Sequence, residues 1–345
     1  MWILRPSKLS DLQQVERIAA ASAVGITTLP PDRDKLYDKI RASVHSFAAD
    51  VDVNGEETYF FVLENVATGE IAGVSGITAS AGFHDRFYSY RNELVVHSSP
   101  ELGVSNRIHT LHLCHDLTGH SLLTSFYIAP DLEASVWPQL LSRGRLLFIA
   151  EFPRRFSDRL AAESPGLCDD DGRSPFWDAV GRRFFNMEYP QAEQVTGGRN
   201  KSFIAELMPH SPVYVPLLPD EAQLAIGQLH PVGELPFGIL VDEGFEADTY
   251  VDIFDGGPAV EARLSGLATM RSNRRLQVAA GEPDSTAATP CLIATTATES
   301  WRATIAPLAR PEGDTIRLGE ALMALLEIAP GDEVRVAAVR REVEA

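Results

Sequence analysis

Residues Leu122–Phe148 read LLTSFYIAPDLEASVWPQLLSRGRLLF, and they place a strand pattern directly before a helix pattern. Apolar, β-branched and aromatic residues fill most of the first eight positions, which is typical of a strand. From about Ser135 the spacing becomes that of an amphipathic helix, which we expect to reach about Phe152. Many folds hold a phosphate where a strand runs into a helix, because free backbone N–H groups and the helix dipole point at the ligand there.

The same junction lacks the residue type that such phosphate loops need. Glycine lets the backbone approach a phosphate without a Cβ atom in the way. The first half of this loop has no glycine and offers Glu133, Val136, Trp137 and Pro138 instead. These residues alone leave open whether a phosphate site has been lost here or was never present.

The segments before the junction predict the order β–α–α–β–β. We expect a strand in MWILRPS, a helix capped by Ser10, a second helix begun by the turn at Pro30–Asp32, and two strands joined by a hairpin at 67–70. The segment Phe83–Gly119, rich in aromatic residues and histidine, is expected to be an elaborated connection to the strand at 122–129.

The segments after the junction continue an alternation of strands and helices. DRLAAESPG predicts a strand, and SPFWDAVGRRFFNMEY predicts a helix with Ser174 as N-cap and Pro175 at its first position. YVDIFDGGP predicts a strand and a turn. This alternation predicts an α/β (α+β) fold, a mixed sheet flanked by helices.

After about Met270 small residues, threonine and short valine runs dominate the sequence. This change of texture predicts a small β-rich, barrel-like C-terminal domain. We therefore expect two domains, one at residues 1–265 and the other at 270–345, in keeping with a length of 345 residues.

The composition excludes several classes of protein. A formal net charge of −18 argues against non-specific nucleic-acid binding, although it suits a cationic substrate as well as plain solubility. The sequence contains no run of about 18 apolar residues, so we expect no membrane-spanning segment. The N-terminus does not show the pattern of a secretory signal. An odd number of cysteines, three, suits a reducing compartment, so we expect a cytoplasmic protein.

A cluster of histidines raises the possibility of a metal-binding site, which we do not favour. The cluster comprises His109, His112, Cys114, His115 and His120. In an extended segment, His109 and His115 point to one side and His112 to the other, so the three do not converge on an ion. We therefore expect no metal site.

The predicted order of strands and helices resembles a known fold, and several longer sequence segments resemble a known protein family. The order β–α–α–β–β–β–α–β–α resembles the GCN5-related N-acetyltransferase (GNAT) fold. Strings spread over nearly the whole chain resemble the arginine N-succinyltransferase family, and its alpha-subunit branch most of all: RNELVVHSSPELGVSN, HDLTG, SPFWDAVGRRFF, FIAELMPHSPVYVPLLPDEAQLAIGQLHP and YVDIFDGGP.

The resemblance implies a reaction and its partners. Succinyl-CoA would donate its succinyl group to the α-amino group of L-arginine, and L-ornithine would also be accepted. Succinyl-CoA would be a co-substrate, with no tightly bound cofactor. The alpha branch is expected to act with a homologous beta subunit in a hetero-oligomer.

The resemblance also implies where the acyl donor and the catalytic proton lie. In the GNAT fold, pantetheine amides pair with backbone groups of a splayed central strand, here LLTSFYIA. Phe126 matches the succinyl-CoA position, with Tyr127 and Ile128 beside it. His230 matches the proposed proton donor, and an imidazole transfers protons near neutral pH.

Three carboxylates are candidates for the arginine side chain. Asp252 and Asp255 flank a tight Gly-Gly-Pro turn, where they would either hold a guanidinium or cap the turn. Glu163, in DRLAAESPG, is a further candidate acid. The residues leave open which carboxylate binds the guanidinium, as they do the preference between arginine and ornithine.

The family's phosphate loop normally follows the pattern Arg/Gln-x-x-Gly-x-Gly/Ala, and this chain departs from it. Glu133, Val136 and Pro138 stand at the arginine and the two glycine positions. Arg143 and Arg145, deeper in the helix, are candidates to reach back to the pyrophosphate. Two hypotheses follow: a catalytic subunit that binds CoA by an altered route, and a non-catalytic homologue that stabilises or regulates a beta subunit.

Overall fold

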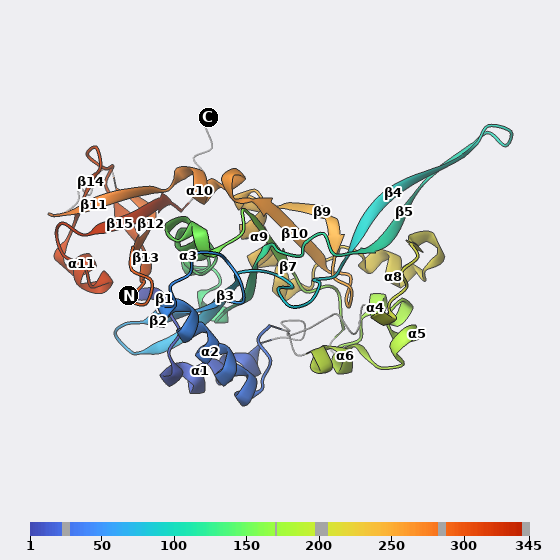
Figure 1. The fold of residues 1–345 in the computed structure, drawn as a ribbon, viewed down its shortest axis with the longest axis horizontal. Helices are drawn as coiled ribbons and strands as arrows, with labels where there is room; N and C mark the ends of the chain where they lie inside the picture. The colour runs from blue at the N-terminus through green and yellow to red at the C-terminus, as the bar shows by residue number, and fades with distance from the viewer. Residues whose placement is uncertain (23–27, 170, 197–205, 282–287, 340–345) are drawn as a thin grey trace.

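One large mixed sheet runs through the molecule and is flanked by helices, as Figure 1 shows. The computed structural model describes residues 1–22, 28–169, 171–196, 206–281 and 288–339. The strand order of this 15-stranded sheet is β14-β11-β15-β12-β13-β1-β2-β3-β6-β7-β10-β9-β4-β5-β8.

The strands of the sheet span most of the chain. They are β1 Trp2–Pro6, β2 Thr58–Asn65, β3 Glu70–Thr78, β4 Ser89–Ser99, β5 Val104–Cys114, β6 Ser121–Ile128, β7 Arg159–Glu163, β8 Val213–Tyr214, β9 Glu246–Val251, β10 Pro258–Arg263, β11 Arg274–Ala280, β12 Thr289–Thr295, β13 Ala303–Leu308, β14 Thr315–Leu318 and β15 Glu333–Ala338.

Most of the helices are short, and only α1, α2, α3 and α9 have ten or more residues among those described. They are α1 Leu12–Ala21, α2 Arg33–Ala48, α3 Trp137–Glu151, α4 Pro175–Ala179, α5 Arg182–Phe185, α6 Tyr189–Thr196, α8 Asp220–Ala225, α9 Glu234–Glu243, α10 Ala268–Ser272 and α11 Glu320–Leu326. Short 3-10 helices lie at Leu9–Asp11, Pro130–Leu132, Pro153–Arg155, Val215–Leu217, Pro231–Gly233 and Leu264–Gly266.

The N-terminal order β1–α1–α2–β2–β3 confirms the prediction, with one error at the first helix. The turn at Pro30–Asp32 starts α2 as expected, and in the structure the Asp32 carboxylate caps the helix by accepting the backbone N–H of Asp34 and of Lys35, both at 3.0 Å. Ser10 is not an N-cap, because it lies inside a 3-10 turn. The neighbouring Asp11 accepts the Lys8 N–H at 2.7 Å, and a carboxylate is the stronger acceptor.

The predicted helix after Ser174 is two short helices. Ser174 does cap the first of them, accepting the Trp177 N–H at 3.2 Å. The chain then breaks between α4 and α5. Gly181 lies at this break, and a Cβ atom there would stand 2.2 Å from the Trp177 ring, so the tight packing of the two helices requires glycine.

The central helix α3 is buried in the main core. Its side chains pack with β2, β3 and β6 on one side and with C-terminal residues such as Trp301 on the other. Helices α1 and α2 cover the opposite face through Val15, Ile18, Leu36 and Ile40. The strand–helix junction of α3 therefore lies at the centre of the fold.

The C-terminal β-rich part is present as expected. Strands β11 to β15 and α11 enclose an apolar cluster of their own. The described strand pairs form an open row from β14 to β13, and β13 joins the main sheet where Ala303 pairs with Leu4. The division into domains at residues 1–265 and 270–345 stays a prediction.

Candidate active site

The strands β6 and β7 separate after their first residues. These two strands are parallel and pair only at Ser121 with Leu160 and at Leu122 with Ala161. On its other edge β6 pairs with β3 as far as Ile128. Among the described residues, no strand pair covers the β7-facing edge of β6 beyond Leu122, so the wedge between the strands opens toward their C-terminal ends.

A bulge in β6 lies inside this wedge. Ser125 has a φ of +55°, and the register between β3 and β6 shifts between Val74 and Gly76. The Ser125 N–H donates to Thr28 Oγ1 at 3.0 Å, and Ser125 Oγ donates to the Thr28 carbonyl at 3.1 Å. A bulge re-aims the residues that follow it, and here these are the predicted donor-site residues.

Phe126, Tyr127 and Ile128 follow the bulge with their side chains engaged in the core. Phe126 and Ile128 pack with the α3 core, whereas Tyr127 packs with the cluster under α1 and α2. These side chains fit an ordinary core strand. Ile128 is buried and the other two are half-buried, and the predicted pairing with an acyl donor needs only the backbone of β6.

Arg145 supports the bulge from the α3 side. Its Nη1 donates to the carbonyls of Gly76 and Thr124 at 3.3 and 3.4 Å, and its other donors bond to Ser142. The side chain is 2% exposed, and burial lowers the pKa of Arg145 to about 9. Its donors are directed at carbonyls beside the bulge, so we do not retain it as a pyrophosphate ligand.

Arg143 is held away from the phosphate loop. Its Nη1 lies 2.9 Å from Glu243 Oε1 and donates to the Val339 carbonyl at 2.8 Å, with both charged side chains buried. The prediction that it reaches back to a pyrophosphate is not retained, because leaving Glu243 would strand a buried carboxylate.

His230 lies beside the segment that leaves β7. Its backbone N–H donates to the Pro165 carbonyl at 2.9 Å, and an isolated bridge joins Leu229 to Gly166. The half-buried ring accepts the Val232 N–H on Nδ1 at 3.3 Å. In the neutral imidazole this leaves the proton on Nε2, so Nε2 is the nitrogen available for a further hydrogen bond or a proton transfer.

The two aspartates cap the turn between β9 and β10. Asp252 Oδ1 accepts the Phe254 N–H at 2.6 Å. Asp255 uses both oxygens, accepting from Gly257 N–H at 2.8 Å on one and from Gly166 N–H at 2.8 Å on the other. Because a bidentate grip on a guanidinium needs both oxygens of one carboxylate, Asp255 serves here as a turn cap.

Glu163 is the last residue of β7 and is half-buried. Strand alternation places it on the same face as Ala161, which contacts the small cluster with Tyr250. It therefore stands at the open end of the wedge, on the opposite face from α3. Of the three predicted acids, it is the one that we retain for the acceptor.

The N-terminus of α3 offers few donors to a phosphate. Ser135 Oγ accepts the Trp137 N–H at 3.2 Å, Pro138 has no N–H, and the Gln139 N–H bonds to the Val136 carbonyl at 3.1 Å. Glu133 is exposed, whereas Pro138 is buried. The junction is thus an ordinary packed helix start and lacks a ready anion cradle.

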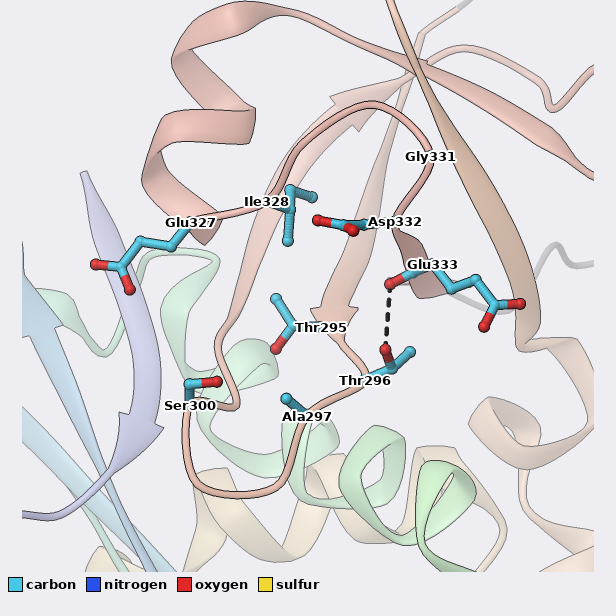
Figure 2. Close-up of a pocket in the computed structure, with 9 residues that line it drawn as sticks. All are labelled: Thr295, Thr296, Ala297, Ser300, Glu327, Ile328, Gly331, Asp332 and Glu333. Atoms are coloured by element: carbon cyan, nitrogen blue, oxygen red, sulfur yellow. Dashed lines mark hydrogen bonds between the residues drawn. The ribbon is translucent and has the colours of Figure 1, made fainter.

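A cavity of about 450 Å³ lies in the C-terminal part, far along the chain from these residues. Figure 2 shows the side chains that line it, which come from the end of β12 and the loop after it and from the segment that leads into β15. Asp332 accepts the Ala329 N–H at 2.8 Å, and Glu333 pairs with Arg275 at 2.7 Å. None of the predicted site residues lines this cavity.

The histidine cluster lies on and just after β5, in the extended form that was predicted. His109 bonds to Asn92 at 2.8 Å, and His112 bonds to Thr110 at 3.0 Å. Over the described part of the chain, no group of three or more His, Cys, Asp or Glu side chains is arranged to hold a metal ion. In the same part, no helix has the length and apolarity needed to cross a membrane.

The chain matches known proteins over nearly its whole length. Residues 2–269 match the family model described as arginine N-succinyltransferase beta subunit, and residues 274–338 match the model of its C-terminal domain. The arginine N-succinyltransferase subunit alpha of Pseudomonas aeruginosa is 50% identical over 98% of this chain and 100% of that protein. Subunit beta of the same organism is 40% identical over 96% of this chain and 97% of its own.

A solved structure shares the fold. The arginine/ornithine succinyltransferase subunit AI from Pseudomonas aeruginosa superposes with a TM-score of 0.90 at 48% identity, covering 99% of each chain. An arginine N-succinyltransferase of Citrobacter koseri is 37% identical over 97% of each chain. Given these matches along its full length, the chain belongs to the arginine N-succinyltransferase family of acyltransferases.

Proposed function

We propose that this chain transfers the succinyl group of succinyl-CoA to the α-amino group of L-arginine, with L-ornithine as a second acceptor. Two relatives are named as arginine N-succinyltransferases, and the name of a solved relative includes both arginine and ornithine. The observation that supports the proposal in this chain is the wedge between β6 and β7, with His230 anchored to the segment that leaves β7.

The acyl donor is proposed to lie along β6. Pantetheine contains two amides, and an edge strand binds an extended chain of amides through its own N–H and C=O groups. The edge of β6 beyond Leu122 supplies such groups. The bulge at Ser125, fixed by Thr28 and Arg145, would set the direction of the N–H groups next to the thioester.

The reaction then needs one bond made and one broken. The neutral α-amine attacks the thioester carbon, the C–N bond forms, and the C–S bond breaks to release CoA as a thiolate. The protonated ring of His230 is proposed to give its Nε2 proton to that sulfur, which leaves CoA as a thiol and the ring as a neutral imidazole. The amine nitrogen loses one proton to solvent and the ring takes one proton from solvent, so charge and protons balance.

The acceptor is proposed to bind on the face that carries Glu163. Arginine and ornithine both bring a positively charged side chain, which a carboxylate binds and, for a guanidinium, binds with two hydrogen bonds. The net charge of −18 favours the approach of such cations. Glu163 stands at the C-terminal end of β7, where the wedge opens.

A second candidate is a non-catalytic subunit that supports a homologous beta subunit. The start of α3 favours it, since Ser135 caps one donor and Pro138 removes another. The presence of His230 favours the catalytic reading, because a purely structural subunit has no chemical need for it. A hetero-oligomer with a beta homologue and a cytoplasmic location, suited to three cysteines in a reducing compartment, are part of this proposal.

The deciding experiment measures arginine-dependent release of CoA thiol from succinyl-CoA. The purified chain is assayed alone and then with a beta homologue. Turnover by the chain alone supports the catalytic proposal and excludes the structural one. If the chain alone neither turns over nor binds CoA, and the mixture keeps full activity with His230→Ala, the catalytic proposal is wrong.

A further inference from the structure

The guanidinium of Arg145 is buried without a carboxylate partner among the described residues. Its Nε and Nη2 donate to the carbonyl and the Oγ of Ser142 at 3.1 and 3.2 Å. Its Nη1 donates to the carbonyls of Gly76 and Thr124 at 3.3 and 3.4 Å. All of these acceptors are uncharged. Burial lowers the pKa of Arg145 only to about 9, so at neutral pH its hydrogen bonds are made while its positive charge is left unbalanced.

The other buried arginines of the described structure each face a source of negative charge. Arg5 and Arg143 form ion pairs with carboxylates at 2.8 and 2.9 Å. Arg155 donates to two carbonyls at the C-terminus of α2, where the helix dipole is negative. Arg145 has neither kind of compensation. A buried charge of this sort is costly to the fold, and strongly perturbed ionisable groups gather at functional sites, so its position calls for a functional explanation.

A second polar group beside the bulge is buried without a partner in the described structure. The Oγ of Ser75 has no hydrogen bond, and this residue is 0% exposed. Ser75 pairs with Phe61, whose ring lies in the α3 core, so the Ser75 side chain lies on the same face of the sheet as Arg145. It stands between Val74 and Gly76, where the register with β6 shifts. Donors and positive charge therefore exceed acceptors at this place, which suits an anionic group.

Arg145 lies directly behind the strand on which the acyl donor is proposed to bind. The Thr124 carbonyl that it contacts belongs to the peptide before the bulge residue Ser125. Its Cζ lies 6.0 Å from the centre of the Phe126 ring, at the predicted succinyl-CoA position. Neighbouring strands lie about 4.8 Å apart, so a group at the free edge of β6 lies on the order of 8 Å from this guanidinium. In a succinyl group two methylenes separate the terminal carboxylate from the thioester carbon, so the carboxylate stays near the bulge when the thioester does.

We propose that Arg145 selects the acyl donor, favouring a thioester whose acyl group ends in a carboxylate over an uncharged acyl group of the same length. The proposal rests on the proposed function, because it needs the donor to lie along β6. Arg145 does not touch the donor, and its charge attracts the carboxylate across the strand. Opposite unit charges about 8 Å apart at an effective dielectric constant of about 20 change a dissociation constant by about 10–30-fold, once screening by salt is included.

The test measures binding of succinyl-CoA and of butyryl-CoA to the whole purified chain by calorimetry, without arginine. The two ligands share CoA and the number of acyl carbons, so the ratio of their dissociation constants isolates the carboxylate. Arg145→Gln is expected to shift this ratio by about 10–30-fold in favour of butyryl-CoA. Arg145→Lys keeps the charge and should keep most of the wild-type ratio. A merely structural role would weaken both ligands alike and leave the ratio unchanged.

A second pair of variants leaves Arg145 in place and decides the matter if Arg145→Gln does not fold. Ser142→Asp puts a carboxylate where Nη2 now meets a hydroxyl, which balances the charge, and it should shift the ratio as Arg145→Gln does. Ser142→Asn has the same shape without the charge and should leave the ratio unchanged. Arg155→Gln removes a buried guanidinium at the C-terminus of α2, away from the bulge, and should also keep the wild-type ratio.

The outcomes separate this proposal from the proposed function. The selectivity proposal is wrong if Arg145→Gln keeps the wild-type ratio, or if Ser142→Asp and Ser142→Asn have the same ratio. When both thioesters bind wild type and no variant shifts the ratio, only the selectivity proposal falls. When neither thioester binds the wild-type chain, the proposed donor site on β6 falls as well.

Discussion

The backbone N–H of His230 donates to the carbonyl of Pro165 at 2.9 Å. Pro165 lies two residues beyond the end of β7, so this bond holds the proposed proton donor next to that strand end. The separation of β7 from β6 forms the wedge. The same segment is held from the other side, because the Gly166 N–H donates to Asp255 Oδ2 at 2.8 Å. Three stretches that lie far apart in the sequence thus meet at the mouth of the wedge.

Replacing His230 by asparagine is expected to lower kcat by about 10²–10⁴-fold, the range for loss of one general acid. The KM for succinyl-CoA should change little, because the ring is assigned to proton transfer and not to binding. Steady-state assays of the active form of the enzyme measure both constants. His84→Asn, at an exposed ring paired with Glu56 at 2.5 Å, is the control that should keep wild-type values. An unchanged kcat in His230→Asn would remove the ring from the mechanism.

Glu163→Gln and Asp255→Asn are expected to have different defects, one in arginine binding and the other in stability. Glu163→Gln is expected to raise the KM for arginine about tenfold or more, because it removes a charge that the substrate binds. Asp255→Asn is expected to lower the free energy of unfolding by about 1–3 kcal/mol, since two backbone donors lose a charged acceptor. Arginine titrations and urea unfolding of both variants separate the roles. A selective arginine KM defect in Asp255→Asn would restore it as a substrate ligand.

The features that could be predicted from the sequence were those that depend on residues close together in the chain. Ser174 was predictable as a helix cap because its side chain reaches an N–H group three residues away, a pattern visible in any short window. The strand before α3 was equally visible from its residues. The prediction for Ser10 was wrong because Asp11 beside it, drawn to Arg5 at 2.8 Å, makes the stronger contacts.

Tertiary partners and special backbone conformations were not predictable in the same way. Arg143 pairs with Glu243, which lies in a different helix far along the chain, and nothing in its own helix indicates that contact. Ser125 adopts a positive φ although it is not glycine, held there by Thr28 from a distant loop. The strands β6 and β7 were predictable from their residues, whereas the splay of β6 was expected only from the resemblance to the GNAT fold.

The buried pair of Arg143 and Glu243 is expected to be costly to break. Glu243 is 2% exposed and also accepts the N–H and Oγ1 of Thr269 at 2.8 and 2.7 Å. Glu243→Gln should lower the free energy of unfolding by about 3–5 kcal/mol, because it leaves a buried guanidinium without its counter-charge. The matched control is Glu327→Gln in the pair with Arg302, where the carboxylate is exposed and its loss is expected to cost about 0–1 kcal/mol. Equal losses in the two variants, measured by denaturant midpoint, would contradict the expectation.

Lys39 should make stability depend on pH in the alkaline range. Burial lowers the pKa of its ammonium from 10.5 to about 8, and its Nζ lies 5.2 Å from the centre of the Phe60 ring. Between pH 8 and pH 10.5 the unfolded chain binds this proton more tightly than the folded chain does, so the free energy of unfolding rises with pH. Below about pH 8 the buried ammonium destabilises the fold to its full extent. Lys39→Met should increase the free energy of unfolding by about 1 kcal/mol at pH 7 and should remove most of its rise with pH.

Thermal unfolding of Lys39→Met and wild type between pH 7 and 10.5 measures this effect. Lys8→Met, at an exposed lysine, is the control and should keep the wild-type slope. If wild-type stability instead falls steadily from pH 8 to 10.5, the fold stabilises the ammonium, and the expected rise with pH is wrong.

The junction that precedes α3 provides the sharpest test of how CoA approaches. Glu133 is exposed beside a helix start whose first donors are taken by Ser135 and Val136 or removed by Pro138. Glu133→Arg should therefore tighten CoA binding only by about threefold to tenfold, through charge alone, and high salt should erase the gain. Pantetheine, which lacks the pyrophosphate, should bind the variant and wild type equally in calorimetry. Glu70→Arg, the same charge change at an exposed hairpin position, is the control. If Glu133→Arg leaves CoA affinity unchanged, the pyrophosphate does not lie at this junction, and the altered route runs elsewhere on the chain or on its partner.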